Sequence, residues 1–214
     1  MIRRALFCAA LLTFSGTGYA EVPSQLIRYL SRPDQAREID NSFVNEWDLS
    51  FGTCRHLAAR GKSLTTFGDI RFDGAGNPVQ GAWKVFADFS GCGQNHRLTT
   101  FFVANKTVKV YPMLPGDTLT DPLLQRDAIG NVLVAAGMIK PAGCNQFRVI
   151  DTKFASFGLL SKQALPGRDK RSWNEDWTVR ACNRTGIATI TFIPDATGTT
   201  IKVSPVKLLG GSSH

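Results

Sequence analysis

Two stretches of the chain repeat apolar residues at the three- or four-residue spacing that is typical of one face of an α-helix. The first stripe consists of Ala36, Ile39, Phe43 and Trp47, and the second of Leu124, Ala128, Val132, Ala135 and Ile139. Asp34 follows Pro33 before the first stripe, and Asp121 precedes Pro122 before the second. Proline and an acidic residue favour the first turn of a helix. The sequence therefore predicts one helix from about residue 33 and another over residues 121–139.

Other segments alternate apolar and polar residues at the two-residue period of β-strands. In the first half of the chain, Trp83, Val85, Ala87 and Phe89 share one face, opposite Lys84, Asp88 and Ser90. In the second half, Trp173, Trp177 and Val179 share one face, opposite Asn174, Asp176 and Arg180. Further strands are predicted at residues 64–72, 98–104, 108–111, 187–193 and 201–203, with a turn at residues 73–78.

The second half of the chain repeats the first at an offset of 90 residues. The matched pairs are Cys54 with Cys144, Phe67 with Phe157, Trp83 with Trp173, Cys92 with Cys182 and Phe102 with Phe192. No gap is needed from Cys54 to Thr107, and a three-residue insertion follows in the second copy. Because cysteine and tryptophan are rare residue types, their coincidence indicates a duplication.

The predicted fold is α+β, a tandem duplication of a unit with one helix and about four antiparallel strands. A helix packed on one face of such a sheet buries a single hydrophobic core. The expected segments are a signal peptide (1–20), an N-terminal helix (21–32), a first unit (33–112), a linker (113–121), a second unit (122–209) and a polar tail (210–214).

The first 20 residues have the three-part pattern of a secretory signal peptide. Arg3 and Arg4 supply the positive charge, residues 5–14 are apolar, and small residues precede a cleavage site after Ala20. The apolar run is too short for a permanent membrane anchor. We therefore expect a mature protein without a transmembrane anchor, in the periplasm or secreted; the alternative is a buried N-terminal helix.

Four cysteines remain in the mature chain, and the repeat selects how they pair. Four cysteines allow three connectivities, and two copies of one unit are expected to close the same bridge. The predicted disulfides are Cys54–Cys92 and Cys144–Cys182, each spanning 38 positions. A zinc site is the alternative, but such sites normally contain close C-x-x-C pairs, which this sequence lacks. Oxidising conditions outside the cytoplasm favour disulfides.

Composition narrows the range of partners. Hydrophobic residues make up 43% of the chain and charged residues 20%, which is typical of a globular protein. The formal net charge of +8 falls to +6 without Arg3 and Arg4. A mildly basic surface favours anionic partners such as phospholipid headgroups or acidic glycans, although it also serves solubility alone. The sequence has no nucleic-acid-binding motif, and nucleic acid is not an expected partner.

Catalytic and cofactor-binding motifs are absent: H-E-x-x-H, G-x-S-x-G, G-x-G-x-x-G and the P-loop do not occur, and no cofactor is predicted. His56 and His96 follow Cys54 and Cys92 closely, so the first disulfide would bring these histidines near each other. They are a candidate metal or acid–base pair in the first unit alone. Histidines in surface loops are more often incidental.

Two segments of the second unit are candidates for binding. Arg168, Lys170 and Arg171 form a basic loop that would suit phosphate or an anionic glycan, or that is simply a solvated hairpin tip. Trp177 ends an aromatic and acidic cluster that would suit carbohydrate stacking, or that belongs to the core with a solvated rim. The acidic neighbours Glu175 and Asp176 point to opposite faces of a strand, which does not favour paired catalytic carboxylates.

The segments from Trp173 to Cys182 and from Phe192 to Thr199 resemble a pattern in uncharacterised exported proteins of Gram-negative bacteria. Those proteins end in a tryptophan-rich strand, a cysteine strand and an F-x-P-D-x-x-G-T hairpin. The resemblance covers about 30 residues and implies export but no activity. The predicted architecture is also similar to that of β-lactamase inhibitory proteins, which implies a concave sheet surface that binds another protein.

These observations favour a binding or interaction protein whose partner is a protein, a glycan or an anionic envelope surface. Two alternatives stay open. One is a hydrolase of unrecognised type that places His56 with His96, or Glu175 with Asp151, in a pocket. The other is a structural component of the bacterial envelope.

Overall fold

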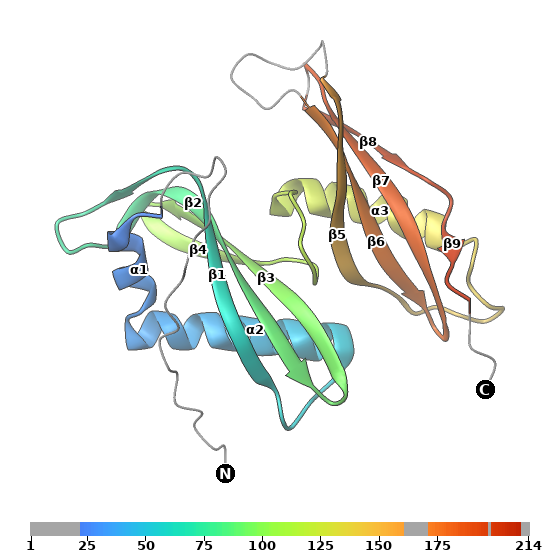
Figure 1. The fold of residues 1–214 in the computed structure, drawn as a ribbon, viewed down its shortest axis with the longest axis horizontal. Helices are drawn as coiled ribbons and strands as arrows, with labels where there is room; N and C mark the ends of the chain where they lie inside the picture. The colour runs from blue at the N-terminus through green and yellow to red at the C-terminus, as the bar shows by residue number, and fades with distance from the viewer. Residues whose placement is uncertain (1–21, 161–170, 197, 211–214) are drawn as a thin grey trace.

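The computed structural model describes residues 22–160, 171–196 and 198–210. These residues form two units, each with one long helix packed against an antiparallel sheet (Figure 1). The predicted α+β duplication is confirmed. The segment expected to be a signal peptide and residues 211–214 of the expected tail lie outside the described residues.

The first unit begins with helices α1 (Ser24–Leu30) and α2 (Pro33–Phe51). Its four strands pair in chain order: β1 (Ala58–Phe72), β2 (Pro78–Gly91), β3 (Gln94–Asn105) and β4 (Thr107–Pro112). The apolar stripe of α2 packs on the face of the sheet that carries Trp83 and Val85. Strand β1 starts six residues before the predicted position. Its first residues pair with β2 but are exposed and show no apolar alternation, so the pattern did not predict them.

The second unit contains helix α3 (Pro122–Ala136) and strands β5 (Phe147–Leu160), β6 (Arg171–Ala181), β7 (Arg184–Pro194) and β8 (Thr199–Val203), again paired in chain order. A short strand β9 (Lys207–Leu208), which the sequence did not predict, pairs with β7. The carboxylate of Asp121 accepts a hydrogen bond from the Leu124 amide at 2.8 Å and caps α3 as predicted. The helix ends before residue 139 because the amides of Met138 and Ile139 donate to carbonyls three residues earlier, which forms a tighter turn than an α-helix.

The two cores contain the same cross-strand aromatic pair. Trp83 lies opposite Phe102 with ring centroids 5.4 Å apart, and Trp173 lies opposite Phe192 at 4.9 Å. Both pairs are stacked and stand at the 90-residue offset. Equivalent residues therefore occupy equivalent places in the two units.

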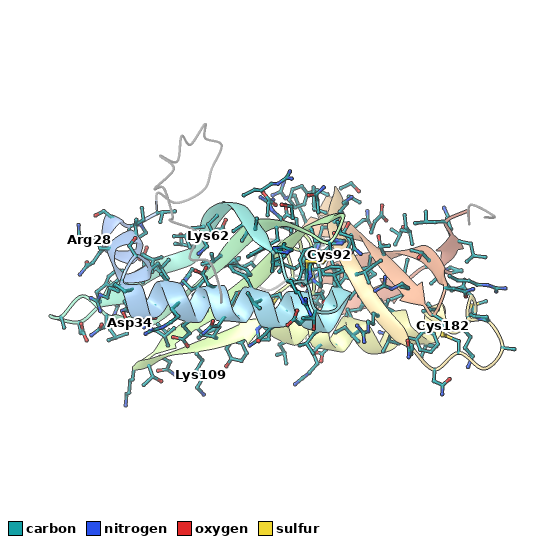
Figure 2. All side chains as sticks on the ribbon, turned by 90° about the horizontal axis from the view of Figure 1, so that it is seen from below. Arg28, Asp34, Lys62, Cys92, Lys109 and Cys182 are labelled. Atoms are coloured by element: carbon teal, nitrogen blue, oxygen red, sulfur yellow. A yellow bond between two sulfur atoms is a disulfide. The ribbon has the colours of Figure 1, made fainter. Side chains whose placement is uncertain are left out.

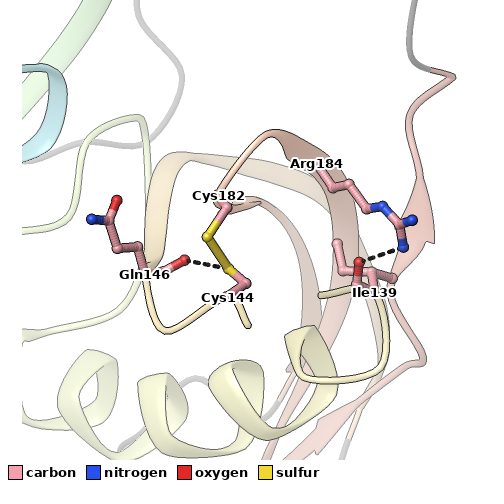
Figure 3. The surroundings of a disulfide bond; sticks show 5 residues. All are labelled: Ile139, Cys144, Gln146, Cys182 and Arg184. Atoms are coloured by element: carbon pink, nitrogen blue, oxygen red, sulfur yellow. Dashed lines mark hydrogen bonds between the residues drawn. A yellow bond between two sulfur atoms is a disulfide. The ribbon is translucent and has the colours of Figure 1, made fainter. Parts of the chain in front are cut away.

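Each unit also has its own disulfide, as predicted. Cys54 is bonded to Cys92 and Cys144 to Cys182, with Cα–Cα distances of 5.9 and 6.0 Å. Each bond connects the segment before the first strand of a unit to the turn between its second and third strands. Beside the second disulfide, Arg184 donates a hydrogen bond to the Ile139 carbonyl at 3.2 Å and fixes the chain after α3 (Figure 3).

The connecting segment (residues 113–121) is packed between the units. On one side Gly116 donates to the Arg97 carbonyl of β3 at 2.7 Å. On the other side the backbone amide of Asp117 donates to the Thr152 carbonyl of β5 at 2.6 Å. Because this segment covers the outer face of the first sheet, β2 and β3 are buried on both faces. Figure 2 shows the result, two units side by side between the end that carries Arg28 and the end that carries Cys182.

Among the described helices, α2 is the longest, and neither it nor the other two has the length and apolarity required to cross a membrane.

Candidate functional site

An open groove of about 320 Å³, the inter-unit groove, lies where the C-terminal end of α2 meets α3 and β5. Its walls are mostly apolar: Leu49, Leu114, Ile129, Leu133, Phe147 and Val149. Its polar lining consists of Glu46, Ser50 and Arg148. Both units and the connecting segment contribute residues, so the groove exists only when the two units are assembled.

Glu46 is the unusual residue in this groove. It lies on the buried face of α2, between Phe43 and Trp47, and only 8% of its surface is exposed. One carboxyl oxygen accepts a hydrogen bond from the Ser50 hydroxyl at 3.1 Å, and no described residue donates to the other. Burial raises the pKa of Glu46 to about 7, since the ionised form loses its hydration.

Two arginines of the second unit hold the groove together at the end of α2. Arg148 donates to the Leu49 carbonyl at 2.6 Å, and Arg180 donates to the Ser50 carbonyl at 3.3 Å. They are cross-strand neighbours on β5 and β6. The last turn of α2 has no basic residue of its own, and the free carbonyls of a helix end carry partial negative charge. The second unit therefore supplies positively charged donors for the carbonyls at the end of α2.

A buried ionic network connects the units on the other side of the connecting segment. Lys84 of β2, 1% exposed, donates to the carbonyls of Thr118 and Thr120, each at 2.7 Å. Glu175 of β6 is fully buried, and its carboxylate accepts hydrogen bonds from four donors. These donors are the Thr118 hydroxyl, the Leu119 amide and the indoles of Trp173 and Trp177, at 2.8–3.0 Å. Burial lowers the pKa of Lys84 to about 8, and the Glu175 carboxylate opposes this effect.

The residues that the sequence proposed for binding are not part of the groove. Arg168 and Lys170 lie outside the described residues. Arg171 is exposed on β6, with its guanidinium 4.2 Å from the ring centre of Phe157. Trp177 is fully buried in the core, so a ligand does not reach its ring in this conformation.

The residues of the candidate acid–base pairs have different surroundings. The ring of His96 stacks on Phe51 with centroids 3.7 Å apart, and burial lowers its pKa, whereas His56 is exposed. Asp151 forms an ion pair with Lys153 at 3.4 Å, while Glu175 is occupied by the network above. Within the described part of the chain, no cluster of three or more His, Cys, Asp and Glu side chains could hold a metal ion.

A second hollow, of about 420 Å³, lies between α1 and the turn at residues 73–77. It is lined by two basic residues, Arg28 and Arg32, and Arg32 already donates to Asn77 and to the carbonyls of Ala75 and Gly76. This guanidinium holds the turn against the helix and is not available as an anion site. The inter-unit groove is the better candidate because its carboxyl group has an oxygen without such a partner.

Searches against protein-family models, curated proteins and solved structures gave no match. The geometry of the chain itself therefore defines the candidate site: a small apolar groove at the junction of two α+β units, with one buried carboxyl group.

Replacing Glu46 by glutamine is expected to change how stability depends on pH. Because the folded pKa is raised from 4.5 to about 7, the folded protein holds this proton more tightly than the unfolded chain. The resulting stabilisation is complete below pH 4.5 and is lost as the pH rises through 7. From pH 5 to pH 8, the stability of Glu46→Gln relative to the wild type should therefore rise by about 2–3 kcal/mol.

Urea unfolding at the two pH values measures this difference. Glu38→Gln, an exposed substitution on the same helix, is the matched control and should show no such change. Parallel pH profiles for the wild type and Glu46→Gln would show that Glu46 is not a buried acid.

Proposed function

We propose that this protein is an exported binding protein that holds a small apolar ligand in the inter-unit groove. The signal-peptide pattern and the two disulfides support export, because disulfides form and persist in oxidising compartments. The sequence alone favoured a protein, glycan or anionic surface as partner. The apolar walls of the groove support a different class of ligand.

The observation that carries the proposal is the composition of the groove. Small-molecule sites are typically concave spaces of about 300–1,000 Å³ with mostly apolar walls and a few polar groups, often where domains meet. The inter-unit groove, at about 320 Å³, has this composition and this location. Its size suits an aliphatic chain or an aromatic ring system rather than a helix of a partner protein.

The polar groups of the groove support binding rather than bond cleavage. The Ser50 hydroxyl donates to Glu46, and one N–H of Arg148 donates to the Leu49 carbonyl, so both side chains are bonded to the helix end. A hydrolytic site needs a nucleophile whose proton is taken by a positioned base, with donors aimed at the developing charge. The groove instead offers a mostly apolar surface with one acidic contact.

Blocking the groove should abolish the binding of an uncharged apolar probe. Leu133→Glu places a charge in the wall, whereas Val134→Glu adds the same charge at a position that is 77% exposed. We expect N-phenyl-1-naphthylamine to bind the wild type and Val134→Glu with a fluorescence increase at one site per chain. Binding to Leu133→Glu should be at least tenfold weaker.

The protein for this measurement is the mature chain from Glu21, and its recovery outside the cytoplasm with that amino terminus also tests export. Equal probe binding by the two glutamate variants would contradict the proposal, since the probe would then occupy another surface.

A further inference from the structure

We infer that the ligand is a cationic amphiphile: an aliphatic or aromatic body that ends in a protonated amine, which donates to the free carboxyl oxygen of Glu46. This inference rests on the proposed function and adds the charge and hydrogen-bonding character of the ligand's head group.

The first argument is the unused acceptor of Glu46. Only one oxygen of its carboxyl group has a hydrogen-bond donor among the described residues, the Ser50 hydroxyl, and the other oxygen is not enclosed by the protein. This oxygen is therefore an acceptor that a ligand in the groove can reach. A primary ammonium supplies up to three donors together with the positive charge that a buried carboxylate lacks.

The second argument is the electrostatic surroundings of the groove. Glu46 lies in the penultimate turn of α2, where the carbonyl ends of the peptide dipoles point toward the groove end and favour a cation. The opposing charges come from β5 and β6: Arg148 and Arg180. Their guanidinium groups are already bonded to the last carbonyls of the helix.

The remaining elements around Glu46 add no charge to the groove. The lining residues of α3 and of the connecting segment are Ile129, Leu133 and Leu114. From β3, His96 packs against the end of α2, and burial lowers its pKa, so it is neutral at neutral pH and above. An anionic head group would have to lie beside the Glu46 carboxyl group, and one N–H donor of Arg148 is already bonded to the Leu49 carbonyl.

The third argument is the match between the apolar walls and an alkyl chain. Six apolar side chains surround the space next to Glu46, and each methylene group buried against them should raise affinity roughly fourfold. The head group and the chain are therefore recognised by adjacent parts of one groove.

This recognition is expected to depend on pH. The pKa of Glu46 without ligand is about 7, so an ammonium that needs the carboxylate must expel a proton when it binds at lower pH. A primary alkylamine stays protonated throughout this range, with a pKa near that of lysine, about 10.4. Affinity for the amine should fall by up to about a hundredfold from pH 8 to pH 5.

The test is displacement of N-phenyl-1-naphthylamine by decylamine, 1-decanol and decanoate, each below its aggregation limit, at pH 5 and pH 8. At pH 8, decylamine should bind the wild type most tightly, and only its affinity should drop steeply at pH 5. Glu46→Gln should bind decylamine and decanol about equally at both pH values, while Glu38→Gln should behave as the wild type. The net charge of the mature chain, +6, would favour decanoate at the surface, so preference for the amine has to arise in the groove.

Equal affinities of decylamine and decanol for the wild type at pH 8 would overturn the inference and leave the apolar binding site intact. Tighter binding of decanoate would overturn it in favour of a head group held by Arg148. Failure of all three compounds to displace the probe would contradict both the inference and the proposed function.

Discussion

Replacing Lys84 by methionine is expected to lower the free energy of unfolding by about 3–5 kcal/mol, because it removes a buried charge on which two carbonyls and a nearby carboxylate depend. The ammonium group of Lys84 is the donor to two buried carbonyls of the connecting segment. Its charge is also attracted by the fully buried carboxylate of Glu175. Methionine fills a similar volume but leaves that carboxylate without a counter-charge. At pH 7 Lys84, with a pKa of about 8, is mostly protonated, so a measurement at this pH reports the removal of the charged group.

Urea unfolding at pH 7 measures this loss, and Lys153→Met provides a matched control. Lys153 forms an ion pair with Asp151 at the surface, where 73% of the lysine side chain is exposed, so its removal should cost less than about 1 kcal/mol. The double variant Lys84→Met with Glu175→Gln should lose less stability than the sum of the single variants, because their charges interact. Strict additivity, or similar losses for both lysine variants, would show that no buried charge pair holds the units together.

Removing either disulfide is expected to lower the free energy of unfolding by about 4 kcal/mol, because each closes a loop of about 39 residues. The reason is mainly the greater conformational freedom of the unfolded chain. In each unit the loop includes the whole first strand and the hairpin turn, where Cys92 and Cys182 adopt positive φ values of 49° and 52°. Small units bury modest cores, so such a loss is a large fraction of their stability.

The two disulfides serve as controls for each other. Their loops have equal length, so Cys54→Ala with Cys92→Ala should cost about as much as Cys144→Ala with Cys182→Ala. Urea unfolding followed by tryptophan fluorescence reports both units, since each contains core tryptophans. A loss below about 1 kcal/mol for either pair would contradict the idea that loop closure dominates its effect.

Much of the fold was predictable because the signals are local or repeated. The apolar stripes of α2 and α3 and the capping residue Asp121 placed the helices. The 90-residue repeat selected the disulfide pairing among three connectivities, which spacing alone does not do. Strand β9 was missed because two paired residues produce no detectable alternation.

The sequence did not reveal that both faces of the first sheet are buried. By alternation, Lys84 belongs to the face opposite Trp83, which is normally the solvent face of an antiparallel sheet. That face is covered by the connecting segment, a contact that no local pattern encodes. A signal for Glu175 did exist: it shares its strand face with Trp173 and Trp177, and an acidic residue at such a position requires partners.

The groove could not be predicted from local sequence patterns, because segments that are distant in the sequence form it. The sequence nevertheless contains one sign that Glu46 is unusual. It falls three residues after Phe43 and directly before Trp47, within the apolar stripe of α2, where a charged residue is unexpected. The sequence analysis placed the binding residues in the second unit instead, because a basic loop and clustered aromatic residues are easier to recognise in a sequence than one buried acid.

The most direct test of the binding site is a crystal structure of the mature protein with 10-bromodecylamine, in which the bromine is located by its anomalous scattering. We predict a single bromine position between Leu49 and Leu133, with the ammonium within hydrogen-bonding distance of Glu46. A bromine on an exposed aromatic surface, such as that of Phe154 and Phe157, with an empty groove would contradict the account.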